Sequence, residues 1–161
     1  MRQILFLIFF CYSLPLLASQ AGRDGFSGNP ATNGGADCTA CHTSGATLPT
    51  VVISGPTAVD AATTHSYTVT INGGPAVTGG INVSTQDHAG LLAPVNSDLH
   101  VVGSEISHTA PKAFTGSNAS FSFDWTAPTY NGDVSLYAAG NSTDGQLSLF
   151  GDAVATSALV V

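Results

Sequence analysis

Hydrophobic and polar positions alternate along this chain in short runs that are typical of β-strands. The clearest run spans 117–127, where Phe121, Phe123 and Trp125 alternate with small or acidic polar residues, so that one face is apolar. Gly, Pro, Asn and Asp separate the runs, at roughly the eight-to-twelve-residue spacing of sandwich proteins. The other runs that we expect to be strands are 48–54, 65–71, 79–86, 91–95, 99–102, 133–140, 146–150 and 153–161.

This pattern predicts an all-β fold. No run of ten or more residues has helical periodicity. A series of short strands divided by turn signals indicates an antiparallel, immunoglobulin-like β-sandwich. The three aromatic residues of 117–127 are expected in the core between the two sheets rather than on a stacking surface. About 140 mature residues are enough for one domain with a single core.

The N-terminus has the pattern of a secretory signal peptide. Arg2 supplies one positive charge ahead of the apolar run 4–17, which is too short for a membrane span. Ser19 and Ala21 place small residues at the minus-three and minus-one positions, so we expect cleavage after Ala21, with Ala18 as the second choice. Removal of residues 1–21 makes the mature protein periplasmic or extracellular and leaves no membrane-spanning segment.

The mature chain then divides into a loop and a sandwich. Residues 22–47 are rich in Gly and Asn and lack hydrophobic periodicity, whereas the strand pattern fills 48–161. The whole chain carries 10 acidic and 3 basic residues, a net charge of −7. This charge disfavours attraction to nucleic acid or to an anionic membrane surface, and it favours a basic electron-transfer partner.

The loop contains CTACH at 38–42, which has the C-x-x-C-H pattern of c-type haem attachment. At this spacing the thiols of Cys38 and Cys41 can bond to one edge of the macrocycle, and His42 becomes the proximal iron ligand. The remaining cysteine, Cys11, leaves with the signal peptide. The sequence therefore predicts one covalent haem c.

Three other uses of the cysteine pair are weaker. A disulfide is chemically available after export, but closing a two-residue loop constrains little of the unfolded chain. A thioredoxin-like pair is found next to a βαβ pattern, which is absent here. Structural zinc needs further ligands nearby, and the next histidine is His65.

Several short motifs follow one another in the order of a known family. They are GNPATNGGADCTACH at 28–42, ISH at 106–108, FSFDWTAP at 121–128, GDVSLYAAGNSTDG at 132–145 and GDAVAT at 151–156. In this succession the chain resembles the bacterial choice-of-anchor V proteins, exported domains related to the reeler domain. The resemblance implies a reeler-like β-sandwich preceded by a single haem-binding loop. Members often end in a surface-sorting tail; none follows here, so we expect a soluble or partner-held form.

The mature chain cannot supply a methionine as second axial ligand, because the one methionine, Met1, leaves with the signal peptide. The candidates are the four remaining histidines, water, or a ligand from another molecule. His108 is our first choice, since it matches the His that precedes the Trp strand in the resembled family. A purely hydrogen-bonding role is the alternative, because reeler domains without a haem motif also carry that His. His88 is the second choice, and His65 and His100 are expected to face solvent.

These features favour a monohaem c-type cytochrome module that carries single electrons in the periplasm or outside the cell, rather than an enzyme. One haem can only pass its electron to a neighbour, which implies a redox partner protein or self-assembly. Two other roles use the same residues: a surface or adhesion module in which haem or a disulfide is mainly structural, and a haem protein that responds to a gas or peroxide. The sequence predicts no catalytic residues.

Overall fold

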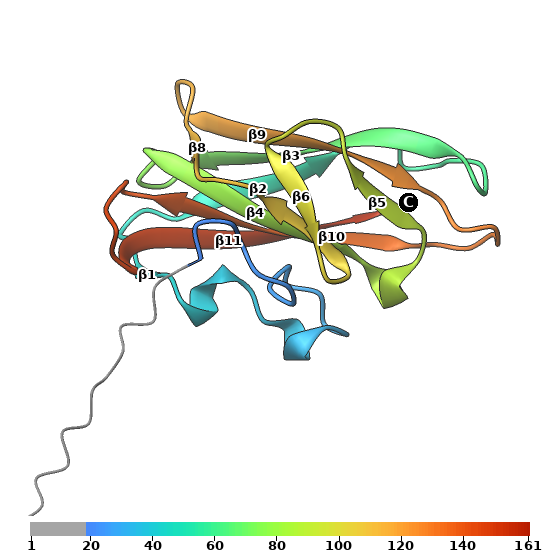
Figure 1. Ribbon diagram of the computed structural model, residues 1–161, viewed down its shortest axis with the longest axis horizontal. Helices are drawn as coiled ribbons and strands as arrows, with labels where there is room; N and C mark the ends of the chain where they lie inside the picture. The colour runs from blue at the N-terminus through green and yellow to red at the C-terminus, as the bar shows by residue number, and fades with distance from the viewer. Residues whose placement is uncertain (1–18) are drawn as a thin grey trace, which may run out of the picture.

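The computed structural model describes residues 19–161 and is a sandwich of two β-sheets (Figure 1). Residues 1–18, with most of the expected signal peptide and Cys11, lie outside the described part of the chain. All strand pairs are antiparallel except one at a sheet edge, between the first and last strands. The predicted all-β antiparallel sandwich is confirmed.

The larger sheet has seven strands in the order β1-β11-β10-β4-β7-β6, with β8 paired to β4. The smaller sheet has four strands in the order β2-β3-β9-β5. The larger sheet is formed by β1 (Thr43–Ser44), β4 (Thr78–Thr85), β6 (Leu99–Val102), β7 (Glu105–His108), β8 (Lys112–Ala113), β10 (Ser135–Thr143) and β11 (Phe150–Val160). The smaller sheet is formed by β2 (Pro49–Ser54), β3 (Thr64–Gly73), β5 (Leu91–Pro94) and β9 (Asn118–Thr126).

The core lies between the sheets and is built on the aromatic face of β9. Phe121, Phe123 and Trp125 are buried, as the alternation in the sequence predicts. Tyr67 of β3 stacks on Phe123, with ring centroids 5.8 Å apart, and meets Trp125 edge-on at 6.1 Å. The Trp125 Nε1–H donates to the carbonyl of Ala89 at 3.0 Å, so the one polar group of the indole is satisfied inside the core.

The structure differs from the predicted strands in a few places. Residues 146–149 are a loop, not a strand: the Gln146 N–H donates to the Asp144 side chain, and β11 begins only at Phe150, whose N–H donates to the Ser148 hydroxyl. Three short strands, β1, β7 and β8, were not predicted. Helical structure in the described residues is limited to the 3-10 turns η1 (Asn33–Gly35), η2 (Cys38–Ala40) and η3 (Gln86–His88). None of these is long and apolar enough to cross a membrane.

Residues 22–42, named the N-terminal segment from here on, lie along the outside of the larger sheet (Figure 1). Hydrogen bonds to buried polar side chains hold this segment. Glu105 of β7 accepts from the Ser27 hydroxyl at 2.6 Å, and Asn29 donates to Ser84 of β4 at 3.1 Å. β4 is consequently buried on both faces, although its alternation predicts one polar face in water.

Candidate haem site

The C-x-x-C-H stretch forms a tight turn at the end of the N-terminal segment. Its first three residues are η2, which begins beside Asp37. The Asp37 carboxylate accepts the backbone N–H of Thr39 at 2.7 Å, and the carbonyl at the start of the turn accepts the N–H groups of Cys41 and His42 at 3.2 and 2.9 Å. The turn therefore fixes the two cysteines and the histidine relative to one another without any bound group.

Both cysteines are free, and each is half-buried as a whole residue. Desolvation around the Cys38 sulfur, with the negative charge of Asp37 as the next cause, raises the pKa of this thiol to about 12. At neutral pH Cys38 is thus protonated and a weak nucleophile. Redox-active C-x-x-C pairs have a cysteine with a lowered pKa, so this environment argues against a thioredoxin-like use.

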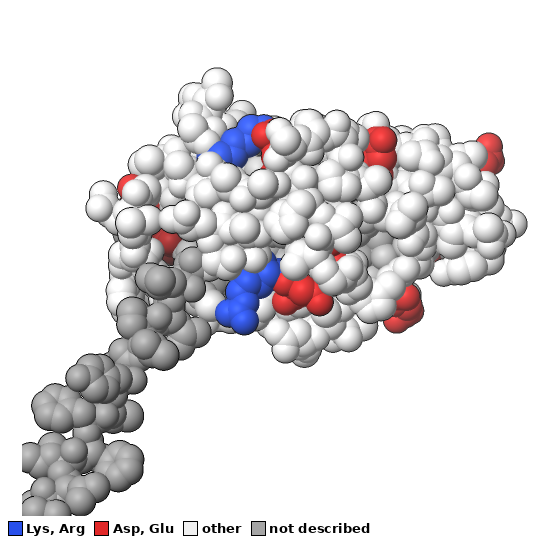
Figure 2. All heavy atoms as spheres, in the orientation of Figure 1, with Lys and Arg blue, Asp and Glu red and all other residues white. Residues whose placement is uncertain are grey.

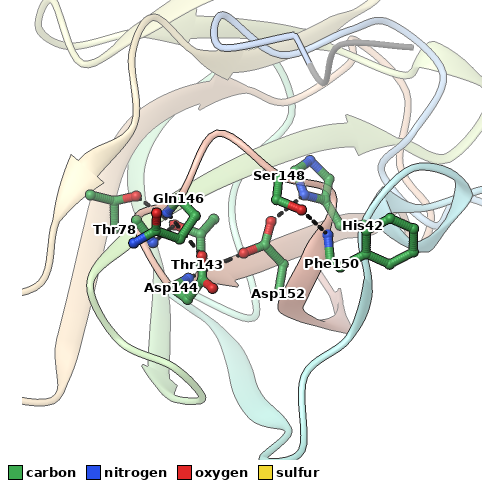
Figure 3. A network of polar contacts seen from close by, with 9 residues as sticks. His42, Thr78, Thr143, Asp144, Gln146, Ser148, Phe150 and Asp152 are labelled. Carbon is green, nitrogen blue, oxygen red and sulfur yellow. Dashed lines mark hydrogen bonds and ion pairs between the residues drawn. The ribbon is translucent and has the colours of Figure 1, made fainter. Parts of the chain in front are cut away.

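Beyond the turn, His42 leads into β1, which pairs in parallel with β11. Thr43 lies opposite Phe150, and this register brings the His42 ring against Asp152 (Figure 3). The Nδ1 of His42 is 2.6 Å from the Oδ2 of Asp152, and Asp152 is only 2 % exposed. The other carboxylate oxygen of Asp152 accepts the backbone N–H of Asp144 at 3.1 Å.

A cavity of about 670 Å³ lies between the N-terminal segment and the outward face of the larger sheet. Its volume falls in the range of about 300–1,000 Å³ that is usual for small-molecule and cofactor sites. Cys38, Cys41 and His42 form part of its wall. Other lining residues are Arg23 and Phe26 of the N-terminal segment, Thr78, Gly80 and Asn82 of β4, His108 of β7, Asn141 and Thr143 of β10, and Leu147, Phe150 and Asp152.

His108, the predicted distal ligand, is therefore brought to the same cavity as His42. Its Nδ1 lies 3.1 Å from both the backbone nitrogen and the carbonyl oxygen of Ile81, whereas Nε2 has no hydrogen-bond partner among the described residues. The ring lies against Gly80, where an added Cβ would come within 2.5–2.7 Å of three ring atoms. Only glycine leaves room for the ring at this position.

The environment of His108 favours the neutral imidazole that can act as a metal ligand. Burial lowers its pKa, the Ile81 carbonyl raises it, and the nearby rings of His100 and His42 lower it further. The net direction is downward. The Ile81 N–H donates to Nδ1, and the Ile81 carbonyl lies at the same distance from it. Metal binding through Nε2 requires the tautomer in which Nδ1 carries the hydrogen and donates to that carbonyl.

The structure does not bring the other histidines to the cavity wall. His88, our second choice, is exposed in η3. His65 is half-buried, with Nε2 2.9 Å from the Thr63 hydroxyl. His100 was expected to face solvent, but its Nδ1 is buried and has no hydrogen-bond partner among residues 19–161. It lies in β6 opposite Ser107 of β7, a strand that was not predicted.

Two features of the wall fit a large, mainly apolar group that carries carboxylates, as haem does. A third feature, the Oδ1 of Asn141, is an acceptor buried without a partner in the described part of the chain, and it needs a donor such as water rather than a carboxylate. Leu147 and Phe150 are 88 % and 69 % exposed at the rim, where an apolar ligand would cover them. Arg23 lies on the wall and forms no ion pair with another described residue, so its charge is available to a carboxylate.

Sequence reasoning missed several of these residues, namely Arg23, Gly80, Asn141 and Asp152. Asp152 could have been found from the sequence. It is the one charged residue in the strand 150–160, and a buried acid in an apolar strand needs a hydrogen-bond partner. The others could not, since only the folded chain places them on one wall. No protein-family model matches the chain, and no curated protein matches it either.

Proposed function

We propose that the protein is an exported monohaem c-type cytochrome module that carries single electrons in the periplasm or outside the cell. The observation that carries this proposal is the meeting of Cys38, Cys41, His42 and His108 on the wall of one cavity. The cysteines would hold haem covalently, with His42 as the proximal and His108 as the distal ligand. When bound, haem supplies a one-electron ferric/ferrous couple.

Two features of the chain favour electron transfer over the other roles. His108 offers a second neutral imidazole, which would leave no open position for a gas or peroxide. The N-terminal segment is already held by Glu105 and by Ser84, so haem is not needed to attach it to the sandwich. A purely structural role for haem would have little left to stabilise.

A single haem needs a partner, and the surface indicates its charge. The described residues contain two cations, Arg23 and Lys112, and Lys112 is paired with Asp98 at 2.6 Å. Figure 2 shows a surface that is mostly uncharged, with acidic groups scattered over it. We therefore infer a redox partner with a basic docking face, or a second copy of this chain brought close by contacts other than charge attraction.

The decisive experiment is expression with the c-type maturation machinery, followed by a haem stain on a denaturing gel. We expect a stained band that disappears in the Cys38→Ala, Cys41→Ala double variant. An unstained wild-type protein would rule out the cytochrome function.

The spectrum of the stained protein then tests the axial ligands. Wild type is expected to be six-coordinate and low-spin and to bind carbon monoxide poorly in the reduced state. His108→Ala should open the sixth position, whereas His88→Ala, a control at an exposed position, should not. A His108→Ala protein that stays six-coordinate and low-spin would refute His108 as the ligand.

A further inference from the structure

The carboxylate next to His42 has a role that the C-x-x-C-H motif does not contain. We propose that Asp152 is the positioning residue of His42: it holds the imidazole with Nδ1 protonated and Nε2 free, and it makes this nitrogen a stronger electron donor. The inference rests on the proposed haem binding and adds to it a residue that sets the reduction potential.

The position of the proton follows from the chemistry of the acceptor. A carboxylate accepts hydrogen bonds and has no proton to donate, so at a separation of 2.6 Å the Nδ1 of a neutral His42 must carry the hydrogen. Nε2 then has the lone pair that a metal ligand requires. Asp152 is buried, and it is the one described residue whose side chain bonds to this Nδ1.

The backbone around Asp152 keeps the carboxylate in place. The parallel pairing of β1 with β11 joins the residue after His42 to the strand that carries Asp152, and the Gly45 N–H donates to the Asp152 carbonyl at 2.8 Å. On the other side the Asp144 N–H holds Oδ1 at 3.1 Å (Figure 3). Asp152 is thus fixed by contacts that do not involve its bond to His42.

A buried negative partner changes the ligand as well as its orientation. Carboxylate–histidine pairs raise the basicity of the metal-bound nitrogen, and loss of such a partner typically costs 10–100-fold in metal affinity or activity. Stronger donation from Nε2 stabilises ferric over ferrous iron. Asp152 should therefore lower the reduction potential. The lack of a methionine in the mature chain should lower it as well, because a methionine ligand raises the potential of haem.

The test compares two neighbouring acids of the same charge. Asp152→Asn removes the charged acceptor but keeps the size of the side chain. Asp144→Asn removes a charge from a side chain that bonds to the Gln146 N–H and not to His42, and so controls for charge alone. In redox titrations of the haem-loaded proteins, we expect Asp152→Asn to shift the ferric/ferrous ratio at fixed potential about tenfold toward ferrous, about 59 mV for one electron. Asp144→Asn should give a much smaller shift, and equal shifts in both variants would overturn the inference.

A second readout does not depend on haem. Nitrogen-15 NMR of the haem-free chain, at a pH where imidazole is neutral, should show His42 protonated at Nδ1 in wild type and mainly at Nε2 in Asp152→Ala. If His42 has the same tautomer in wild type and in Asp152→Ala, the positioning role is refuted. This result does not depend on whether Asp152→Asn folds well enough for a redox titration. A negative haem stain, by contrast, would refute the proposed function while this spectrum still decides whether Asp152 orients the ring.

Discussion

The contact between Gly80 and His108 gives the most specific prediction, because one methyl group tests how His108, the proposed distal ligand, is held. In Gly80→Ala, the new Cβ would lie 2.5, 2.6 and 2.7 Å from Cε1, Nε2 and Nδ1 of His108. Ordinary contact begins at 3.4 Å, so the ring must move by about 0.7–0.9 Å. A shift of this size breaks the 3.1 Å contacts of Nδ1 with Ile81.

The magnitude has two opposing parts. Forcing a group into a packed site costs about 1–3 kcal/mol, and loss of the Ile81 hydrogen bond adds about 1 kcal/mol. Gly80 does not have a left-handed φ, so alanine fits the backbone and reduces the entropy of the unfolded chain, a gain of about 0.4–1 kcal/mol. We expect Gly80→Ala to lower the free energy of unfolding by about 2 kcal/mol.

A double-mutant cycle isolates the contact. In a His108→Ala background there is no ring to displace, so Gly80→Ala should stabilise the protein by about 0.4–1 kcal/mol instead of destabilising it. Urea unfolding of the four haem-free proteins measures both values. In the haem-loaded Gly80→Ala protein, increased carbon monoxide binding should accompany the displaced ring. Equal destabilisation in both backgrounds would refute the proposed contact as its cause.

Three further predictions concern ionisation and the N-terminal segment. Folding lowers the pKa of His108, so as the pH falls the unfolded chain takes up a proton at this histidine before the folded protein does. The contribution of His108 to the free energy of unfolding of the haem-free protein should therefore be complete above about pH 6.5. Below that pH it should decrease by up to about 1.4 kcal/mol per pH unit. His108→Gln should remove this component, and identical pH profiles for both proteins would contradict it. Cys38, with its pKa of about 12, should react slowly with iodoacetamide at pH 8 and about tenfold faster for each unit of rising pH below its pKa; rapid labelling at pH 7 would show that its thiol is not desolvated. Glu105→Ala removes the acceptor of the Ser27 hydroxyl and should lower the free energy of unfolding by about 1.5–3 kcal/mol. Amide hydrogen exchange across 25–36 should become faster. Unchanged exchange there would mean that other contacts hold the N-terminal segment.

Much of the sandwich was predictable, because a strand with one face in the core must alternate. Phe121, Phe123 and Trp125 of β9, like Tyr67 and Val69 of β3, are buried as their spacing requires. The pattern was misleading where polar contacts replace apolar ones. Residues 146–149 resemble a strand by composition, but they form a loop at the cavity rim, where the Asp144 carboxylate and the Ser148 hydroxyl accept the backbone N–H groups of Gln146 and Phe150.

The N-terminal segment shows a second limit of sequence patterns. Its Gly- and Asn-rich composition predicts a loop, and no periodicity indicates that it packs on anything. Ser27 and Asn29 nevertheless bind buried polar groups of the larger sheet, chiefly Glu105 and Ser84. Hydrogen bonds of this kind depend on the position of single atoms and leave no repeating signal along the chain.

The sequence by itself determined the β-sandwich and predicted a haem site from the C-x-x-C-H spacing at 38–42, since these follow from periodicity and spacing within one chain. Only the tertiary structure decided which groups meet around the motif. The pairing of β1 with β11 brings Asp152 to His42, and the fit of the ring against Gly80 brings His108 to the same cavity. Contacts between residues so distant in sequence arise from strand register and close packing, which fix positions in space that no local pattern contains.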